Sequence, residues 1–388
     1  MPVLEDLPEV SGRRVLVRAD FNVPMADGEI TDDLRIRMTV PTLQWLLDQG
    51  SEKVTVCSHL GRPKGRPDAR YSMEPVRERL ASLLESAGAQ PDRVELPDRV
   101  ELLENLRFDP REEAGDESLV TELVAGQDLF VNDAFGAAHR AHASIVGPPR
   151  HLPSAGGRVL AREVEVLEGL LHGAKRPFVA VLGGSKVSEK LGVIEALLDR
   201  VDQLVVGGGM CFTFLAAAGH GVGASLFEPD MLATCRRLLE AGKPILLPSD
   251  LTVLSPGGCF GPGHAPTGEV RQVGVEVPEG WVGLDIGPGT AAEFADTIAA
   301  AATVLWNGPM GVFEDPRFAA GTAAVAEAVA SSRAFTVVGG GDSASALAAF
   351  GLADRVDHLS TGGGASLEMI ERGDLPGLDA LRQSASRR

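Results

Sequence analysis

The chain has 388 residues, of which 44% are hydrophobic and 23% charged, and its formal net charge is −18 at pH 7. This length favours two soluble domains of roughly 150 to 200 residues each over a single core. The strong negative charge argues against a nucleic-acid or anionic-membrane surface, because both need a basic protein face. Any anion site must therefore be a local pocket.

The cysteines and the N-terminus indicate the compartment. Cys57, Cys211, Cys235 and Cys259 stand far apart without metal-ligand spacing, so we expect free thiols in a reducing environment. The first residues lack the basic and apolar regions of a signal peptide, and no window holds 18 uninterrupted apolar residues. We expect a cytoplasmic protein.

The first predicted strand covers residues 13–19 and is followed by Asp20 and Asn22. In open α/β sheets, ligands bind at the carboxyl ends of the strands, so these two side chains are candidate ligand contacts. A helix is predicted from about residue 33 to residue 48, with Arg35 in its first turn. A cation there opposes the helix dipole, so it serves either an anionic ligand or surface solubility.

Three further predicted strands in the first 145 residues also end in basic or imidazole side chains. These are His59 with the Pro/Gly-rich loop that follows it, Arg107, and Arg140. Each alone is compatible with an ordinary loop. If they converge on one sheet edge, they form a pocket for a small polyanion, because guanidinium groups match carboxylate and phosphate oxygens.

The second half of the chain repeats a rhythm of strands and helices. Residues 153–175 change character and predict an interdomain helix with a flexible joint at each end. The apolar runs that follow are 178–182, 204–206, 245–247, 282–286, 303–306 and 335–338. Their spacing predicts a parallel sheet with helices on both faces.

The stretch 178–191 predicts a strand, a glycine turn and a helix N-terminus. Such a turn presents backbone N–H groups to an anion, and phosphate is the anion we expect. Lys186 and Lys190 are four residues apart and are predicted to share a face of the new helix. The alternative interpretation is an ordinary solvated helix face.

Glycines also follow other predicted strands, at residues 207–209, 287–289, 307–311 and 339–341. None matches G-x-G-x-x-G in its strand-to-helix context, and no G-x-x-x-x-G-K-[ST] loop exists, which weakens the nicotinamide-dehydrogenase and P-loop interpretations. Asp342 or Ser343 is either a helix cap or, in the case of Asp342, an oxygen ligand for Mg²⁺ on nucleotide phosphates.

Segments spread over nearly the whole chain resemble the phosphoglycerate kinase family. They are VLVRADFNVP, SHLGRP, ENLRF, VNDAFGAAHRAHAS, FVAVLGGSKVSEK, VGGGM, WNGPMGVFE, VVGGGDS and STGGGASLE, in the family's order. The resemblance implies two doubly wound parallel-sheet (Rossmann-like) α/β domains that face each other across a cleft. The implied domains are residues 1–155 for 3-phosphoglycerate, with 375–388 packed back on them, an interdomain helix and hinge at 156–176, and residues 177–374 for the nucleotide.

The resemblance also implies site residues. The positions implied for phosphoglycerate are Asp20, Phe21, Asn22, Arg35, His59, Leu60, Gly61, Arg62, Arg107 and Arg140. Those implied for the nucleotide are Lys190, Gly208, Gly283, Asn307, Glu314, Gly340, Gly341, Asp342 and Ser343. Asp342 is expected to bind Mg²⁺ and Glu314 to contact the ribose. The family commonly has threonine where this chain has Ser343, which keeps the hydroxyl group.

The implied reaction is reversible phosphoryl transfer between 1,3-bisphosphoglycerate with MgADP and 3-phosphoglycerate with MgATP. The attacking oxygen is already anionic, so the protein must align the substrates and neutralise charge rather than supply a base. We expect Arg35 and Lys186 to do this after hinge closure, in a monomer. A non-catalytic nucleotide-binding scaffold of the same fold is the alternative, although such proteins usually lose the transfer-site cations.

Overall fold

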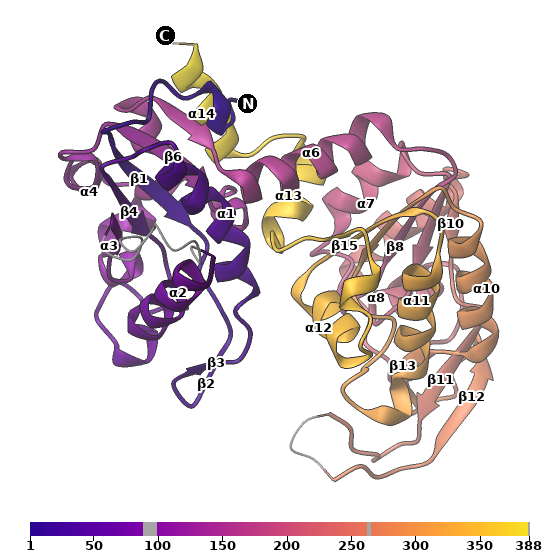
Figure 1. The fold of residues 1–388 in the computed structure, drawn as a ribbon. Helices are drawn as coiled ribbons and strands as arrows, with labels where there is room; N and C mark the ends of the chain where they lie inside the picture. Colours follow the sequence, from indigo (N-terminus) through magenta and orange to yellow (C-terminus); the bar gives the residue numbers. More distant parts are fainter. Residues whose placement is uncertain (88–98, 262–264, 387–388) are drawn as a thin grey trace. The chain divides into compact units, whose positions relative to one another are not determined.

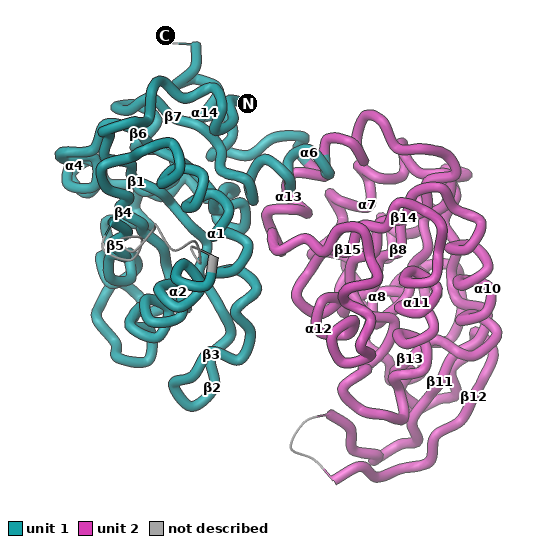
Figure 2. Tube along the Cα trace, in the orientation of Figure 1, with its two compact units in different colours: residues 1–167, 372–388 teal, residues 168–371 magenta. Residues whose placement is uncertain are grey.

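The computed structural model describes residues 1–87, 99–261 and 265–386. The chain forms two compact units (Figure 2). Unit 1 contains Met1–Leu167 and Arg372–Arg388, and unit 2 contains Glu168–Glu371. Each unit is built around a parallel sheet with helices packed against it (Figure 1), so the predicted α/β class is confirmed.

The sheet of unit 1 has the strand order β5-β4-β1-β6-β7, and all its neighbouring strands are parallel. Its strands are β1 (Arg14–Ala19), β4 (Lys53–Cys57), β5 (Val100–Leu102), β6 (Leu129–Asp133) and β7 (Ser154–Gly156). The short strands β2 (Met25–Ala26) and β3 (Glu29–Ile30) form a separate hairpin. The carboxyl ends of β1, β4 and β6 therefore lie at one edge, as the sequence pattern predicts.

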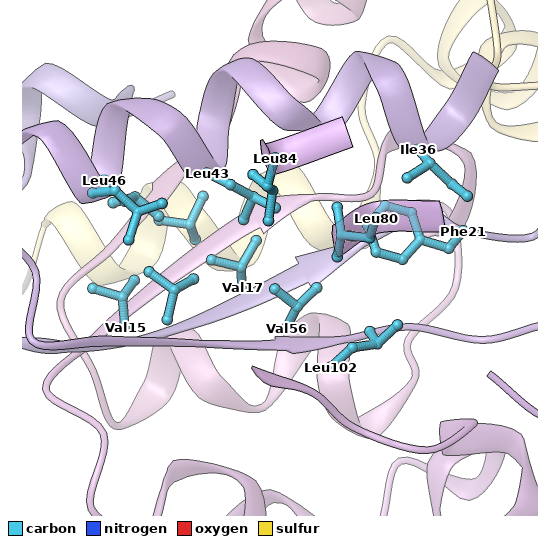
Figure 3. Packing of buried hydrophobic residues seen from close by; sticks show 14 of the residues in the cluster. Val15, Val17, Phe21, Ile36, Leu43, Leu46, Val56, Leu80, Leu84 and Leu102 are labelled. Carbon is cyan, nitrogen blue, oxygen red and sulfur yellow. The ribbon is translucent and has the colours of Figure 1, made fainter. Parts of the chain in front are cut away.

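Two helices cover one face of this sheet, α1 (Leu34–Asp48) and α2 (Glu74–Ala87). Alternate residues of the strands meet apolar residues of the helices in one core (Figure 3). Its members include Val15, Val17, Val56, Leu43, Leu46, Leu80 and Leu84. Burying a side chain of this size stabilises the fold by about 1.5–3 kcal/mol, so this core fixes the position of α1 and of Arg35 on it.

The other described α-helices that lie wholly within unit 1 are short. They are α3 (Pro110–Ala114), α4 (Glu117–Val124), α5 (Ala143–Val146) and the C-terminal α14 (Pro376–Ala385). The last of these packs against α5 and β7. Two hydrogen bonds hold it there, from the Gly377 amide to the Ala138 carbonyl at 2.9 Å and from Ser384 Oγ to the Leu152 carbonyl at 3.2 Å.

The larger sheet of unit 2 has the order β10-β9-β8-β14-β15-β16 and is parallel throughout. Its strands are β8 (Phe178–Leu182), β9 (Gln203–Val206), β10 (Ile245–Leu246), β14 (Thr303–Asn307), β15 (Phe335–Gly339) and β16 (His358–Leu359). The helices are α7 (Leu191–Leu198), α8 (Met210–Ala217), α9 (Leu232–Glu240), α10 (Pro288–Ala299), α11 (Ala320–Ser331), α12 (Gly341–Ala349) and α13 (Gly364–Arg372). Residues of α10, α11 and α12 share one core with β8, β14 and β15.

One predicted strand belongs to a different sheet. The run 282–286 is β13 (Val282–Ile286), which pairs in antiparallel fashion with β11 (Asp250–Leu254), and β11 pairs with β12 (Val270–Gly274). The expectation that this run joins the parallel sheet was therefore wrong. A short apolar run predicts a buried strand but does not identify its neighbours.

A long helix, α6 (Arg158–Gly173), occupies most of the predicted linker 156–176, and the boundary between the units falls within it. Asp133, at the end of β6, holds its first turn by accepting hydrogen bonds from the amides of Val159 at 2.8 Å and Leu160 at 3.2 Å. Among the described residues, no helix combines the length and apolar content needed to cross a bilayer.

Candidate active site

The glycine turns of unit 2 interlock at the carboxyl ends of the parallel strands. The Gly184 amide donates to the Pro309 carbonyl, and the Gly208 amide to the Met310 carbonyl, both at 3.1 Å. Gly208 has φ +65°, and a Cβ atom there would lie 2.6 Å from the Gly184 nitrogen and 2.8 Å from the Pro309 oxygen. Only glycine fits, because the turns approach more closely than a side chain allows.

Lys190 lies between two of these turns. Its Nζ donates to the Gly183 carbonyl at 2.6 Å, to the Asn307 carbonyl at 3.0 Å and to Asn307 Oδ1 at 2.6 Å. Burial lowers the pKa of Lys190 to about 8, although the nearby Asp342 carboxylate favours the charged form. All three ammonium donors are therefore used inside the protein.

The predicted shared helix face of Lys186 and Lys190 was wrong. Helix α7 starts only at Leu191, with Lys190 as its N-cap, because the preceding residues form a turn closed by a hydrogen bond from the Lys190 amide to the Val187 carbonyl. Lys186 is 49% exposed and pairs only loosely with Glu189, at 3.5 Å. It is the lysine of this pair that remains available to a ligand.

Asn307 and Ser343 also connect turns. Asn307 Nδ2 donates to the Gly339 carbonyl at 2.8 Å, and Ser343 Oγ accepts from the Gly308 amide at 2.6 Å. Both side chains are almost fully buried. They therefore shape the backbone around the site, whatever else they contact when a ligand is bound.

The alternative that Asp342 or Ser343 caps the helix was wrong. Helix α12 starts at Gly341 with Gly340 as N-cap and no side-chain cap bond, so both residues lie inside the first turn. Asp342 is exposed, and within the described part of the chain no hydrogen bond or ion pair occupies its carboxylate. A carboxylate in this position is free to take a ligand.

These turns border two adjoining pockets within unit 2, with volumes of about 590 and 250 Å³, which share Gly184, Ser185 and Asp342. All the residues predicted for the nucleotide line one or both. The larger pocket contains Gly208, Gly283, Glu314 and Asp342. The smaller contains Lys190, Asn307, Gly340, Gly341, Asp342 and Ser343, together with Lys186.

The larger pocket also has an apolar lining that the sequence analysis missed, including Phe212, Leu226 and Phe260. Leu226 is 51% exposed and Phe260 is 38% exposed, which is unusual for such side chains. A Cβ on Gly283 would lie 2.1 Å from Cζ of Phe212, so the missing side chain at residue 283 leaves space for the Phe212 ring. No motif marks these apolar residues as a site, because they come from three separate places in the sequence.

In unit 1, Asp20 and Arg35 form an ion pair at the end of β1. Burial by itself would raise the pKa of Asp20, but the charges of Arg35 and Arg18, with a hydrogen bond from the Asn22 amide, outweigh it and lower the pKa of this carboxyl. Asn22 Oδ1 accepts from the Gly61 amide at 2.8 Å, and Arg107 Nη1 donates to the Gly61 carbonyl at 2.9 Å. The predicted residues from three strand ends therefore meet at one place.

The other predicted residues of this site differ in exposure. Phe21 and Leu60 are buried in the core, so their side chains position the backbone and do not face a ligand. Arg62 and Arg140 are exposed. Arg140 lies near enough to His142 to help lower its pKa to about 4, after the larger effects of burial, Arg107 and Arg18.

Arg18 is a further member of this cluster that the sequence analysis missed. It is fully buried, and its Nη2 lies 3.2 Å from Nδ1 of His59. Burial first, and then the positive charge of Arg18, lowers the pKa of His59 well below its usual value, so the ring is neutral. The available signal was an arginine inside an otherwise apolar strand, where a charge needs a partner.

The residues fit a bound Mg²⁺ that is held mainly by a substrate. The described residues contain no group of three His, Cys, Asp or Glu side chains arranged to hold a metal. Mg²⁺ bound with nucleotide phosphates needs only one or two protein carboxylates. The unpaired Asp342 beside the glycine turns meets that requirement.

Glycine turns at the ends of a doubly wound sheet, bordered by the Asp342 carboxylate and the exposed Lys186, define a nucleotide-binding α/β protein of the kinase type. The family model for phosphoglycerate kinase matches residues 4–373. The phosphoglycerate kinase of Salinispora arenicola is 54% identical over 97% of this chain and 98% of its own length, and that of Rubrobacter xylanophilus is 52% identical over 96% of both.

A solved structure of phosphoglycerate kinase from Coxiella burnetii superposes with a TM-score of 0.86 at 37% identity, covering 99% of both chains. The chain belongs to the phosphoglycerate kinase family. It is an enzyme of the phosphotransferase class, and its pathway is glycolysis.

Proposed function

We propose that this enzyme transfers a phosphoryl group reversibly between 1,3-bisphosphoglycerate with MgADP and 3-phosphoglycerate with MgATP. The observation that carries the proposal is that every residue predicted for the nucleotide lines the two adjoining pockets of unit 2. The larger pocket, at about 590 Å³ and with apolar walls, has the size and character of a site for a base and a ribose. The smaller one is bordered by backbone turns and by Lys186, as a phosphate site requires.

Within this site, Glu314 is the acceptor for the ribose hydroxyls, because it lines the larger pocket. The exposed side chain of Lys186 provides a positive charge that neutralises the transferring phosphoryl group. Asp342 would hold Mg²⁺, and the ion supplies charge neutralisation at the phosphate oxygens when bound. The hydrogen bonds of Lys190, Asn307 and Ser343 hold the glycine turns in position relative to one another.

The basic cluster of unit 1 binds phosphoglycerate in this proposal. Arg35, Arg107, Arg62 and Arg140 supply cations for its carboxylate and phosphate groups. Asp20 is ionised and accepts hydrogen bonds only, which suits the hydroxyl group of a glycerate. The Asp20–Arg35 pair also holds the arginine ready before the substrate arrives.

The chemistry needs no general base, because the attacking oxygen on ADP or on the carboxylate is already anionic at pH 7. The work of the protein is to align the two oxygens and to neutralise charge on the transferring group. Arg35 and Lys186 perform this task. Neither residue needs to gain or lose a proton.

We also propose the domain roles and boundaries given by the resemblance, with residues 1–155 and 375–388 for phosphoglycerate, 177–374 for the nucleotide and 156–176 as the hinge. The division of the chain within α6, and the packing of α14 on unit 1, support these boundaries. Since each substrate has its own unit, transfer requires the units to close around the hinge. Small-angle scattering with and without both substrates tests this step, and an unchanged radius of gyration would contradict it.

A coupled assay with 3-phosphoglycerate and MgATP tests the reaction itself. We expect turnover that depends on both substrates and on Mg²⁺, and no binding in an NADH titration. ATP binding without turnover would instead support the non-catalytic scaffold. A non-catalytic scaffold has no use for the transfer-site residues. The chain has all three of them, Arg35, Lys186 and Asp342, and this favours the enzyme.

The proposal includes a monomer in the cytoplasm. The four cysteines are free thiols, three of them buried, which agrees with a reducing compartment. Light scattering after size exclusion measures the oligomeric state. A dimer at micromolar concentration would contradict this part of the proposal.

A further inference from the structure

A chain of buried polar side chains runs from His59 through Arg18 on β1 to Ser144 and Glu112. Arg18 Nε donates to Ser144 Oγ at 2.8 Å, and Ser144 Oγ donates to Glu112 Oε1 at 2.6 Å. The Ser144 amide donates to the other carboxylate oxygen of Glu112 at 2.9 Å. Arg18, Ser144 and Glu112 are all fully buried.

The direction of each hydrogen bond in this chain is determined by the groups involved. Arginine has only donors, so Nδ1 of His59 must be the acceptor at 3.2 Å from Arg18 Nη2. The proton of the neutral ring is therefore on Nε2. In the same way, the Ser144 hydroxyl must accept from Arg18, so its own proton points to Glu112.

Glu112 is the negative end of the chain and balances the buried charge of Arg18. Its other cationic candidate, His142, has Nδ1 at 3.9 Å from Glu112 Oε1, beyond hydrogen-bond distance, and a pKa lowered to about 4. The guanidinium of Arg18 is thus oriented by the Ser144 hydroxyl, which links it to Glu112, and by the Ala19 carbonyl, which accepts from Nη1. A buried charge without this partner would be costly.

We propose that Glu112, Ser144 and Arg18 are positioning residues that hold His59 in its Nε2–H tautomer, so that a neutral ring presents a hydrogen-bond donor to the anionic substrate of unit 1. This inference rests on the proposed function for the identity of that substrate. The tautomer itself is a property of the free protein and is measured without any ligand.

The test uses the full chain with ¹⁵N-labelled histidine and the variant Ser144→Ala, which removes the hydroxyl between Arg18 and Glu112. We expect long-range ¹H–¹⁵N spectra to show the Nε2–H tautomer of His59 in the parent protein and a mixture of tautomers in the variant. We expect the KM for 3-phosphoglycerate to rise roughly fivefold, the effect of losing one hydrogen bond, with the KM for ATP unchanged.

Ser154→Ala is the matched control. Ser154 is also buried in unit 1, and its hydroxyl donates to the Leu152 carbonyl at 2.7 Å, in no contact with His59. Ser154→Ala should lose about as much folding stability as Ser144→Ala. It should leave the His59 tautomer and the KM for 3-phosphoglycerate unchanged. If Ser144→Ala does not fold, Glu112→Gln replaces it, because a neutral amide no longer compels the serine hydroxyl to donate toward residue 112.

A native tautomer of His59 in the folded variant would overturn the proposal. So would an Nδ1–H tautomer in the parent protein. Failure of the proposed function is distinct from both outcomes, because it would appear as absent turnover of 3-phosphoglycerate by the parent protein while the tautomer measurement remained readable.

Discussion

Nζ of Lys190 lies 2.6 Å from Oδ1 of Asn307, and this contact joins the turn after β8 to the turn after β14. The same ammonium group also holds the backbone carbonyls of Gly183 and Asn307. A residue expected to contact phosphates is thus first of all a partly buried connection between two turns that border the smaller pocket. Its effects on stability and on binding should therefore be linked.

Lys190→Met keeps the length of the side chain and removes its donors. We expect the free energy of unfolding to fall by about 1–3 kcal/mol, because buried acceptors lose their partner. Urea denaturation measures the change. Lys175→Met, at an exposed lysine, is the control and should change stability by less than about 0.5 kcal/mol. Equal stability of the two variants would contradict the structural role.

The pKa of Lys190, lowered to about 8, predicts a pH dependence. Between about pH 8 and the unfolded value of 10.5 the unfolded chain holds a proton that the folded chain does not, so stability should rise with pH over this range. The cost of the buried charge is fully present below pH 8. The difference in unfolding free energy between the parent protein and Lys190→Met isolates this contribution, and a difference that is flat with pH would count against it.

Nucleotide binding should also couple to this group. A polyphosphate in the smaller pocket favours the charged lysine and raises its pKa, so binding at pH 8 should take up a fraction of a proton. Calorimetry in two buffers of different ionisation enthalpy measures the uptake. Lys190→Met should abolish it.

Lys186→Ala tests the proposal that Lys186 neutralises charge on the transferring phosphoryl group. Because the side chain is half-exposed and makes only a surface ion pair with Glu189, its removal should leave stability nearly unchanged. The kcat should fall roughly 10²- to 10³-fold, and the KM for 3-phosphoglycerate should stay within about twofold. Lys243→Ala, at a surface lysine of the same unit paired with Asp199, is the control. Normal turnover by Lys186→Ala would refute the catalytic role.

Gly283→Ala tests the proposal that the larger pocket of unit 2 binds the nucleotide base. The new methyl group would meet the Phe212 ring, which must shift into the larger pocket or out of the core. We expect the Kd for ADP to rise at least tenfold, on the order of 1.4 kcal/mol, as measured by calorimetry. Gly274→Ala on β12, where a Cβ meets nothing within 4 Å, should bind ADP normally. Parent-like affinity of Gly283→Ala would show that Phe212 does not shape the site.

The raised pKa of Asp285 predicts a second dependence of stability on pH. Burial raises its pKa to about 7, although its carboxylate accepts from the amides of Gly321 at 2.7 Å and Ile286 at 2.9 Å. Between about pH 4 and 7 the folded chain therefore holds a proton that the unfolded chain releases, and stability should fall as pH rises. Asp285→Asn should remove this part of the slope in thermal melts at matched pH values. A slope identical to that of the parent protein would show that Asp285 is ionised throughout.

The sequence by itself determined the α/β class, most strand positions and most of the polar residues and glycines that gather at the candidate site. Parallel strands followed by glycine turns are visible in the chain because the backbone conformation after each strand requires glycine locally. The basic side chains near Asp20, His59 and Arg107 were identified for a similar reason, since the carboxyl ends of parallel strands meet at one edge.

Only the tertiary structure decided which of these groups remain free. Lys186 and Lys190 have the same side chain and stand four residues apart, yet their surroundings differ. Lys186 is exposed, whereas the ammonium group of Lys190 donates hydrogen bonds to three carbonyl-type oxygens. The placement of 282–286 in an antiparallel sheet, and the connection of Arg18 to Glu112, depend on contacts between residues far apart in the chain. Local pattern carries no information on such partners, because burial and hydrogen bonding are set by the packing of the whole unit.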